Sequence, residues 1–295
     1  MGPNRSFLFA PGDHARRVEK ALTLAADAVI LDLEDAVAIS NKVAARALVV
    51  AALQASRRPH GYVRVNSFDT PFCFGDIQAV VVPGLDGIVL PKLEDAAQLV
   101  AVHWMLRALE RERGLPEGGI DLMPIIETAR GHVAVRELAR TAATLGGRVR
   151  RLAFGAGDYT LDLGMAWSLE EAELAPVRAE MVLASRNAEL EPPVDTVWIE
   201  LREAEAYVRS CARSVAIGFQ GRMCIHPDQI DPAHAAYSPP AEEVARAERM
   251  VAAFAVAEAQ GLAAIQLEGR FIDYPIVQRA ERVLQLHRSI QAKKS

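Results

Sequence analysis

Cysteine is rare in this chain, and long apolar runs are missing. Cys73, Cys211 and Cys224 are scattered, odd in number and without metal-ligand spacing, so neither a disulfide framework nor a zinc site is expected. We expect them to be small buried hydrophobic residues. No apolar stretch approaches the roughly 20 residues of a membrane span, and the N-terminus leads into residues 6–9 without the apolar core of a signal peptide. The prediction is a cytoplasmic protein with no membrane partner.

An excess of positive charge and a phosphate-binding glycine loop are also missing. The net charge of -5 argues against nucleic acid as a general partner, although a local basic patch could attract a phosphorylated small molecule. Gly155, Gly157 and Gly164 do not have phosphate-loop spacing. With 295 residues, of which 51% are hydrophobic, the chain can form one large core and an appendage.

Short apolar segments recur along the chain, and helix-like segments separate most of them. The predicted strands are residues 6–10, 28–33, 61–66, 87–91, 121–126, 151–155, 196–201 and 221–225. The predicted helices are residues 14–25, 42–56, 95–113, 129–145, 170–190 and 203–218. The connection 67–86 contains two prolines and two glycines, so its helix must be short. This alternation implies parallel pairing with right-handed crossovers, and eight such units predict a closed (β/α)8 barrel.

The pattern changes after Ser238-Pro239-Pro240. Residues 242–260 predict a long helix, residues 268–274 a loop, and residues 275–291 a last helix with proline at its start. Because this tail lies outside the eight-strand count, we expect a barrel over residues 1–237 and a separate C-terminal helical segment over residues 238–295.

Polar side chains follow the predicted strands at the points where they end. In chain order they are Glu34, Asp35, Arg64, Asn66, Lys92, Glu127, Asp158 and His226. The C-terminal ends of parallel barrel strands meet at one rim, where enzymes with this architecture carry out their chemistry. These side chains are therefore expected to lie close together.

Glu127 and Asp158 suggest a metal site at this rim. Two carboxylates plus waters are the usual ligands of a hard divalent ion such as Mg²⁺, which keeps open positions for an oxygen-rich substrate. An α-keto acid fits, because its carboxylate and ketone oxygens can chelate the metal. Arg64 adds a fixed cation suited to a carboxylate or an enolate oxygen.

Several of these residues also have a purely structural interpretation. Glu127 and Asp158 could each cap the helix that follows, and His226 could bond to the backbone of a turn. The basic stretch within residues 14–20 could be a solvated helix face.

The acidic residues after the second strand have a structural interpretation of their own. Asp32, Glu34 and Asp35 could form an ion-pair network with Lys42 or Arg46 at the barrel rim. The sequence leaves this network and a role in the site as open alternatives.

Several segments, taken in order along the chain, carry a specific resemblance. They are residues 5–12, 31–37 with Lys42 and Arg46, 63–66, 91–92, 126–131, 155–158 and 224–229. Together they resemble the citrate lyase β-subunit-like (HpcH/HpaI aldolase) family, which includes malyl-CoA and citramalyl-CoA lyases. The resemblance covers nearly the whole chain. It implies a (β/α)8 barrel of the phosphoenolpyruvate/pyruvate superfamily that acts with Mg²⁺ on a keto acid and a CoA thioester.

The resemblance also implies roles for individual residues. Glu127 and Asp158 stand at the positions of the magnesium ligands, and Arg64 at that of the arginine facing the keto acid and the thioester oxygen. Arg16 and Lys20 resemble basic residues that meet the phosphates of CoA. Supporting roles around this site fall to Glu34, Asp35, Lys92 and His226.

Two further features concern the tail and the neighbourhood of Asp158. Residues 268–275 resemble a lid in which an aspartate from a neighbouring subunit reaches the active site, and Asp273 fills that position, although it could also be a helix N-cap. A shared lid implies a homo-oligomer, and the resemblance suggests a trimer or hexamer. Gly157 stands where many relatives have a bulkier or acidic residue, which puts the size of the substrate in doubt.

The predicted activity is a Mg²⁺-dependent carbon-carbon lyase that cleaves or forms a β-hydroxyacyl-CoA, such as citramalyl-CoA or malyl-CoA. A citrate lyase β-subunit acting on an acyl-carrier-protein thioester is one alternative, against which the length of residues 239–295 counts. A CoA-independent pyruvate aldolase is a second, disfavoured by residues 5–12 and the basic first helix. A non-catalytic metabolite-binding barrel is the third.

Overall fold

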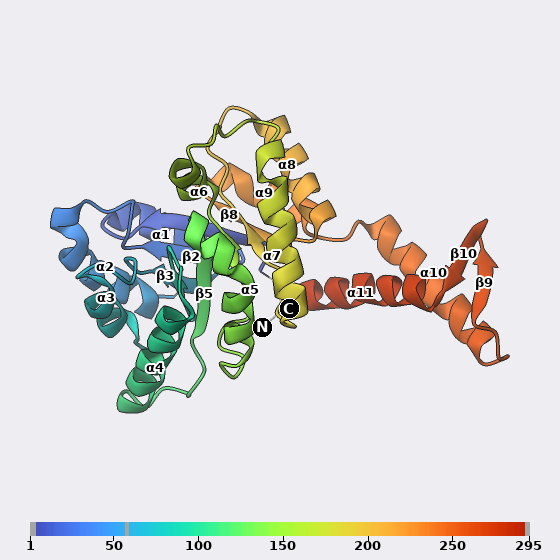
Figure 1. Ribbon diagram of the computed structural model, residues 1–295, viewed down its shortest axis with the longest axis horizontal. Helices are drawn as coiled ribbons and strands as arrows, with labels where there is room; N and C mark the ends of the chain where they lie inside the picture. Colours follow the sequence, from blue (N-terminus) through green and yellow to red (C-terminus); the bar gives the residue numbers. More distant parts are fainter. Residues whose placement is uncertain (1–3, 57–58, 293–295) are drawn as a thin grey trace. The chain divides into compact units, whose positions relative to one another are not determined.

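The computed structural model describes residues 4–56 and 59–292, which form two compact units (Figure 1). The first, the barrel unit, contains residues 4–233. The second, the tail unit, begins at His234. Among the described residues, none of the helices is long and apolar enough to cross a membrane.

The barrel unit is built on a closed sheet of eight parallel strands, as predicted. The strands are β1 Ser6–Pro11, β2 Ala28–Asp32, β3 His60–Arg64, β4 Gly87–Leu90, β5 Asp121–Ile126, β6 Ala153–Phe154, β7 Val194–Asp195 and β8 Gly221–Cys224. Each pairs with the next, and β1 closes the ring on β8, where Ser6 lies opposite Arg222. The C-terminal ends of these strands therefore lie at one rim.

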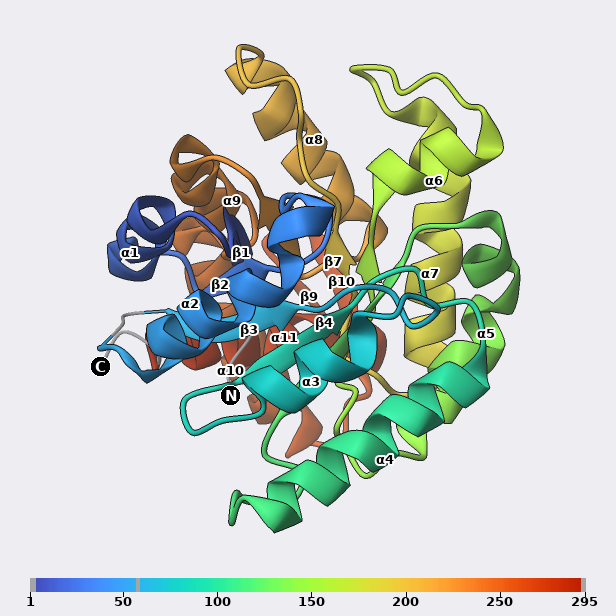
Figure 2. The same cartoon turned by 90° about the vertical axis from the view of Figure 1, so that its left-hand side faces the viewer.

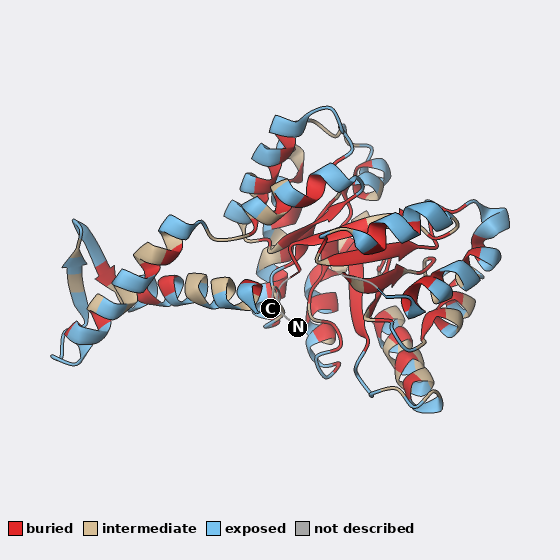
Figure 3. Cartoon of the chain, turned by 180° about the vertical axis from the view of Figure 1, so that it is seen from behind, coloured by how far each residue is buried: buried red, intermediate tan, exposed pale blue. Residues whose placement is uncertain are grey.

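Helices surround the sheet and connect its strands (Figure 2). They are α1 Ala15–Thr23, α2 Lys42–Gln54, α3 Cys73–Val80, α4 Ala96–Glu112, α5 Ala129–Ala143, α6 Ala156–Leu163, α7 Ala175–Asn187, α8 Ala204–Ile217 and α9 Ile230–Ala236. Short 3-10 turns cover Ile39–Asn41, Ala172–Leu174 and Pro227–Gln229. The helix between β3 and β4 is short, as the prolines and glycines of this connection predict. The strands of the barrel are buried, while the outer faces of the helices are exposed (Figure 3).

The barrel interior is filled by side chains from most strands. Phe7 packs edge-on against Tyr62, with ring centroids 5.4 Å apart, and Met123 and Met223 complete the same buried cluster. Gly87 lies beside Tyr62, and a Cβ atom there would overlap the tyrosine ring. A filled interior of this kind makes the barrel a rigid base for its rim.

The prediction for the seventh strand was wrong. Residues 196–201 were expected to pair, but β7 is Val194–Asp195, and the apolar run after it forms a loop. Asp195 is fully buried because it accepts a hydrogen bond from Arg178 and lies 3.6 Å from Arg222. The sequence pattern did not predict this strand because it contains a charged residue, Asp195, and charged residues are normally absent from the core of a parallel sheet unless they form a buried ion pair.

The tail unit contains two long helices and a hairpin. Helices α10 Ala241–Glu258 and α11 Tyr274–Gln291 occur where helices were predicted. Residues 268–274 were expected to be a loop, and this was wrong, because β9 Ala264–Leu267 and β10 Arg270–Asp273 form an antiparallel hairpin. Both residues of its two-residue turn have positive φ, which the twist of such a tight hairpin requires.

The cysteine prediction is confirmed. All three cysteines are free and buried in the barrel unit. Burial raises the pKa of both Cys73 and Cys224 to about 12, so their thiols stay protonated at neutral pH. They act as core residues.

Candidate metal and substrate site

A cavity of about 360 Å³ opens at the C-terminal ends of the strands. Its charged lining consists of Asp32, Asp35, Arg64, Glu127 and Asp158. The remaining wall is made of Phe9, Ala36, Ile125, Gly155, Gly157, Thr196, Val197, Met223 and Ile225. The structure thus brings together residues that lie far apart in the sequence, as the strand-end argument predicts.

Glu127 follows β5 and is buried, with 3% of its surface exposed. Its Oε1 accepts the backbone N–H of Lys92 at 2.8 Å, and its other oxygen has no hydrogen-bond partner among residues 4–56 and 59–292. Burial, together with the Glu34 carboxylate, raises the pKa of Glu127 to about 8. The helix-capping interpretation of Glu127 was wrong, because Thr128 caps α5 by accepting the Gly131 N–H.

Gly155 makes the space that Glu127 occupies. A Cβ atom at Gly155 would overlap the Glu127 carboxylate, so only glycine permits the carboxylate to sit between the ends of β5 and β6. In the sequence alone, Gly155 lacks phosphate-loop spacing and ends a predicted strand. Its function as a cradle depends on the neighbouring strand.

Asp158 lies in the first turn of α6 and is half-buried. Thr196 anchors the start of this helix by accepting the Ala156 N–H at 2.8 Å. The capping interpretation of Asp158 was also wrong, since α6 begins before it and Gly155 is the N-cap residue. The nearest cation is the Lys92 ammonium, 3.5 Å from Asp158 Oδ2.

Arg64 ends β3 and is held by a forked pair of hydrogen bonds. Its Nε and Nη2 donate to the two oxygens of Asp32, each at 2.7 Å. Its Nη1 lies 3.0 Å from Glu34 Oε2, and the guanidinium covers the ring of Phe9 at 4.8 Å. Bidentate contacts fix the plane of the guanidinium, so Arg64 presents a preoriented positive charge to the cavity.

The acidic residues after β2 do form an ion-pair network, but its predicted partners were wrong. Lys42 donates to the backbone carbonyls of Leu33 and Glu34, and Arg46 pairs with Asp76. The cations that the acids contact are instead Arg64 and Lys92. Asp32 and Asp35 pair with these cations and also line the cavity, whereas Glu34 pairs with them and is not among the lining residues.

Lys92 lies at the centre of the carboxylates. Its ammonium is 2.6 Å from Glu34 Oε1, 3.6 Å from Asp35 and 3.5 Å from Asp158. Burial lowers the pKa of Lys92, but the Glu34 carboxylate raises it by more, so the ammonium stays charged. The backbone of Lys92 is left-handed, with a φ of 49°, which is unusual for a residue with a side chain.

Three other predicted residues of the barrel unit lie elsewhere. His226 caps a 3-10 turn by accepting the Asp228 N–H on its Nδ1, as its turn interpretation predicts, and it is not among the residues that line the cavity. Arg16 and Lys20 are exposed on α1. Their CoA role stays a prediction.

In the tail unit, Asp273 is the N-cap of α11 and accepts the Ile276 N–H at 3.3 Å, which agrees with its capping interpretation. Its role in a lid stays a prediction. In the barrel unit, a Cβ atom at Gly157 would meet only the Trp167 ring edge, at 4.0 Å, so this wall of the cavity has room for a larger side chain.

The donor set of the cavity fits a hard divalent cation. Its lining contributes the carboxylates of Asp32, Asp35, Glu127 and Asp158 and one cation, Arg64, while the Lys92 ammonium contacts Asp35 and Asp158 without being among the lining residues. Glu127 and Asp158 could hold Mg²⁺ there, because both are carboxylate residues that line the cavity. No group of three or more His, Cys, Asp or Glu side chains in the described chain forms a complete metal cage. A site with two protein ligands leaves positions open for water and substrate.

Comparison with known proteins identifies similar sequences over nearly the full chain. The family described as HpcH/HpaI aldolase/citrate lyase matches residues 5–227. Citrate lyase subunit beta of Leuconostoc mesenteroides subsp. cremoris is 35% identical over 284 residues, which cover 96% of this chain and 92% of that protein. A (3S)-malyl-CoA thioesterase of Cereibacter sphaeroides is 32% identical over 292 residues, covering 98% and 96%.

A solved structure is similar over the same extent. Protein CitE from Mycobacterium tuberculosis, in complex with magnesium, acetoacetate and coenzyme A, has a TM-score of 0.75 and 30% identity, covering 97% of this chain and 98% of that one. The length of residues 239–295 was expected to count against a citrate lyase β-subunit, and this expectation was wrong. The match to the Leuconostoc protein covers 96% of this chain, so it must include most of the tail.

Proposed function

Because the chain belongs to the HpcH/HpaI aldolase/citrate lyase family, we propose that it is a Mg²⁺-dependent lyase that cleaves or forms a β-hydroxyacyl-CoA. Citramalyl-CoA and malyl-CoA are the proposed substrates, and a keto acid and an acyl-CoA are the products of cleavage. The observation that carries the proposal is the pair Glu127 and Asp158, which line one cavity together with Arg64.

The ligands of relatives support this substrate class. Protein CitE from Mycobacterium tuberculosis is bound to magnesium, a small keto acid and coenzyme A together. The relative from Cereibacter sphaeroides acts on a malyl-CoA thioester. A cavity of about 360 Å³ has room for the keto-acid part and the reacting carbons of such a substrate, while the rest of CoA must lie outside it.

The charged residues of the cavity suit the chemistry of this reaction. Mg²⁺, held by Glu127 and Asp158, would supply a Lewis acid for the keto-acid oxygens. Arg64 is fixed by Asp32 and would stabilise negative charge on the enolate oxygen of the thioester. Because the guanidinium is already oriented, little reorganisation is needed when that charge appears.

CoA itself needs a site outside the cavity. Arg16 and Lys20 are exposed on one helix of an acidic protein, and we assign them to the CoA phosphates. The proton that the enolate carbon receives in cleavage, or loses in synthesis, is assigned to Asp273 of a neighbouring copy. A donated residue demands at least a dimer, and we propose a trimer or a hexamer.

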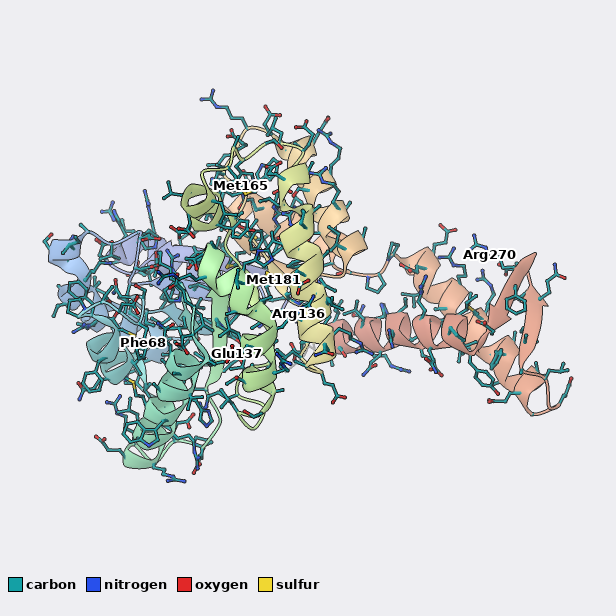
Figure 4. All side chains as sticks on the ribbon, viewed as in Figure 1. Phe68, Arg136, Glu137, Met165, Met181 and Arg270 are labelled. Carbon is teal, nitrogen blue, oxygen red and sulfur yellow. The ribbon has the colours of Figure 1, made fainter. Side chains whose placement is uncertain are left out.

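The test is a substrate panel. The purified protein is incubated with Mg²⁺ and malyl-, methylmalyl-, citramalyl- or citryl-CoA, and the products are identified by mass spectrometry. We expect a keto acid and an acyl-CoA from at least one of them. The control variant Glu137→Gln should behave as the wild type, because Glu137 is an exposed carboxylate of α5 (Figure 4) that does not line the cavity. A panel without any cleavage or condensation contradicts the proposal.

A citrate lyase β-subunit acting on an acyl-carrier-protein thioester is the second candidate. The observation in its favour is the 35% identity to citrate lyase subunit beta across 96% of the chain. Turnover of citryl-acyl-carrier protein together with inertness of every CoA thioester would select this candidate. Turnover of free keto acids without any thioester would instead indicate a CoA-independent aldolase.

Replacing Asp273 by Asn tests the assignment of the proton donor. Asparagine caps helices as well as aspartate does, so α11 should keep its N-cap and its stability. We expect turnover to fall by about 100-fold or more, since proton transfer by a positioned side chain contributes about that factor. Binding of Mg²⁺ and pyruvate, measured by calorimetry, should stay unchanged. Full turnover by this variant would remove Asp273 from the reaction.

A further inference from the structure

Lys92 is the residue of the site whose geometry is hardest to explain as packing. Its φ of 49° lies in the left-handed region, where a residue with a side chain is strained and glycine is not. A glycine here would donate the same N–H to Glu127, so that hydrogen bond does not account for a lysine. Unusual backbone geometry with a retained side chain points to a task for the ammonium.

The contacts of the ammonium define that task. Its nitrogen is 2.6 Å from Glu34 and 3.5 Å from Asp158, while Arg64 is already committed to Asp32 and Glu34. Lys92 is the cation within 4.0 Å of Asp158 in the described part of the chain. A divalent cation that binds Asp158 therefore enters a region where a positive charge already stands.

We propose that Lys92 is a positioning residue that balances charge: it weakens the binding of free Mg²⁺ and strengthens the binding of the anionic keto acid. This assignment rests on the proposed function. The ammonium repels a divalent cation that shares its carboxylate and attracts an anion that arrives beside that cation. A purely structural lysine would support both ligands or neither, so the opposite signs distinguish this role.

The size of each effect follows from one unit charge at contact distance in a partly solvated site. Such an interaction changes a dissociation constant by about tenfold. Lys92→Met, which keeps an unbranched side chain as far as the ε carbon and removes the charge, should bind Mg²⁺ about tenfold more tightly in the absence of keto acid. At saturating Mg²⁺, the same variant should bind pyruvate about tenfold more weakly.

Two further variants guard the interpretation. Lys92→Arg keeps the positive charge, so both dissociation constants should stay within about threefold of the wild type. Lys92→Gly removes the charge and also the backbone strain, while it keeps the N–H that Glu127 accepts. It should reproduce both shifts of Lys92→Met even if the methionine disturbs packing.

The experiment is calorimetric titration of the full-length protein with MgCl₂, and then with pyruvate at saturating MgCl₂. Tighter Mg²⁺ and weaker pyruvate in both neutral variants support the assignment. Parallel weakening of both ligands, or unchanged Mg²⁺ affinity, overturns it and leaves the proposed function standing. Wild-type protein that binds neither Mg²⁺ nor pyruvate overturns the proposed function, and the role of Lys92 with it.

Discussion

Replacing Glu127 by Gln should make the metal-free protein more stable and at the same time remove its binding of Mg²⁺. The two side chains have the same shape, and glutamine can still accept the Lys92 N–H through its carbonyl oxygen. What changes is one negative charge, buried at 3% exposure beside other carboxylates. Stability and function therefore oppose each other at this position.

The magnitude follows from the pKa of Glu127, which burial raises from 4.5 to about 8. A carboxyl with a raised folded pKa disfavours folding above its unfolded pKa, by about 1.4 kcal/mol for each pH unit up to the folded value. The penalty that glutamine removes is thus on the order of 4 kcal/mol at pH 8. It shrinks to less than about 1 kcal/mol near pH 5, which lies only about half a pH unit above the unfolded pKa of 4.5.

The assay is urea unfolding in EDTA at pH 8 and at pH 5, for the wild type, Glu127→Gln and the control variant Glu137→Gln. All three tryptophans (Trp104, Trp167 and Trp198) lie in the barrel unit, so their fluorescence reports that unit alone. Added Mg²⁺ at about 100 times its dissociation constant should stabilise the wild type by about 2.7 kcal/mol and Glu127→Gln hardly at all. Glu137→Gln should behave as the wild type throughout.

Two results would refute the reasoning. Equal stability gains of Glu127→Gln at pH 8 and pH 5 would mean that the carboxyl does not titrate with a raised pKa. Stabilisation of this variant by Mg²⁺ to the same extent as the wild type would mean that Glu127 holds no metal.

Two more predictions concern Arg64 and the barrel wall. Arg64→Lys keeps a positive charge but loses the forked contact with Asp32. Turnover should therefore fall by about 100-fold in steady-state kinetics, while the Mg²⁺ affinity measured by calorimetry should change little. Unimpaired turnover would contradict this prediction. Glu110→Ala should destabilise the barrel by about 3–5 kcal/mol in urea unfolding, because the buried Arg148 loses its carboxylate partner and keeps hydrogen bonds to the neutral acceptors Ile120 and His103. Despite burial, Arg148 keeps the Glu110 pKa below 4.5, so this stabilisation should be present above that pH and disappear below it.

Local patterns were sufficient for most of the barrel, because each strand and helix has its own periodicity. Strands such as 121–126 and the helices after them were predicted to within a few residues. The strand β7 was missed because its Asp195 is tolerated in the core only through Arg178 and Arg222, which come from other elements. The hairpin in the tail was missed because its strands are short and its turn lacks the usual Asn-Gly or Asp-Gly signal.

The sequence alone determined that Arg64, Glu127 and Asp158 lie at the same end of the barrel. The C-terminal ends of parallel barrel strands meet at one rim, and this topological rule predicts that Arg64, Glu127 and Asp158 lie close together, as they do in the cavity that all three line. The order of the strands carries that information, so no contact between distant residues had to be known.

Only the tertiary structure decided how these side chains are held. The cradle at Gly155 and the left-handed Lys92 that joins Glu127 to Asp158 depend on distances across neighbouring strands. The pairing of Asp32 with Arg64, rather than with the predicted partner Lys42, depends on such distances as well. Charge pairing and steric fit are pairwise properties of the folded chain, and periodicity along one segment does not contain them.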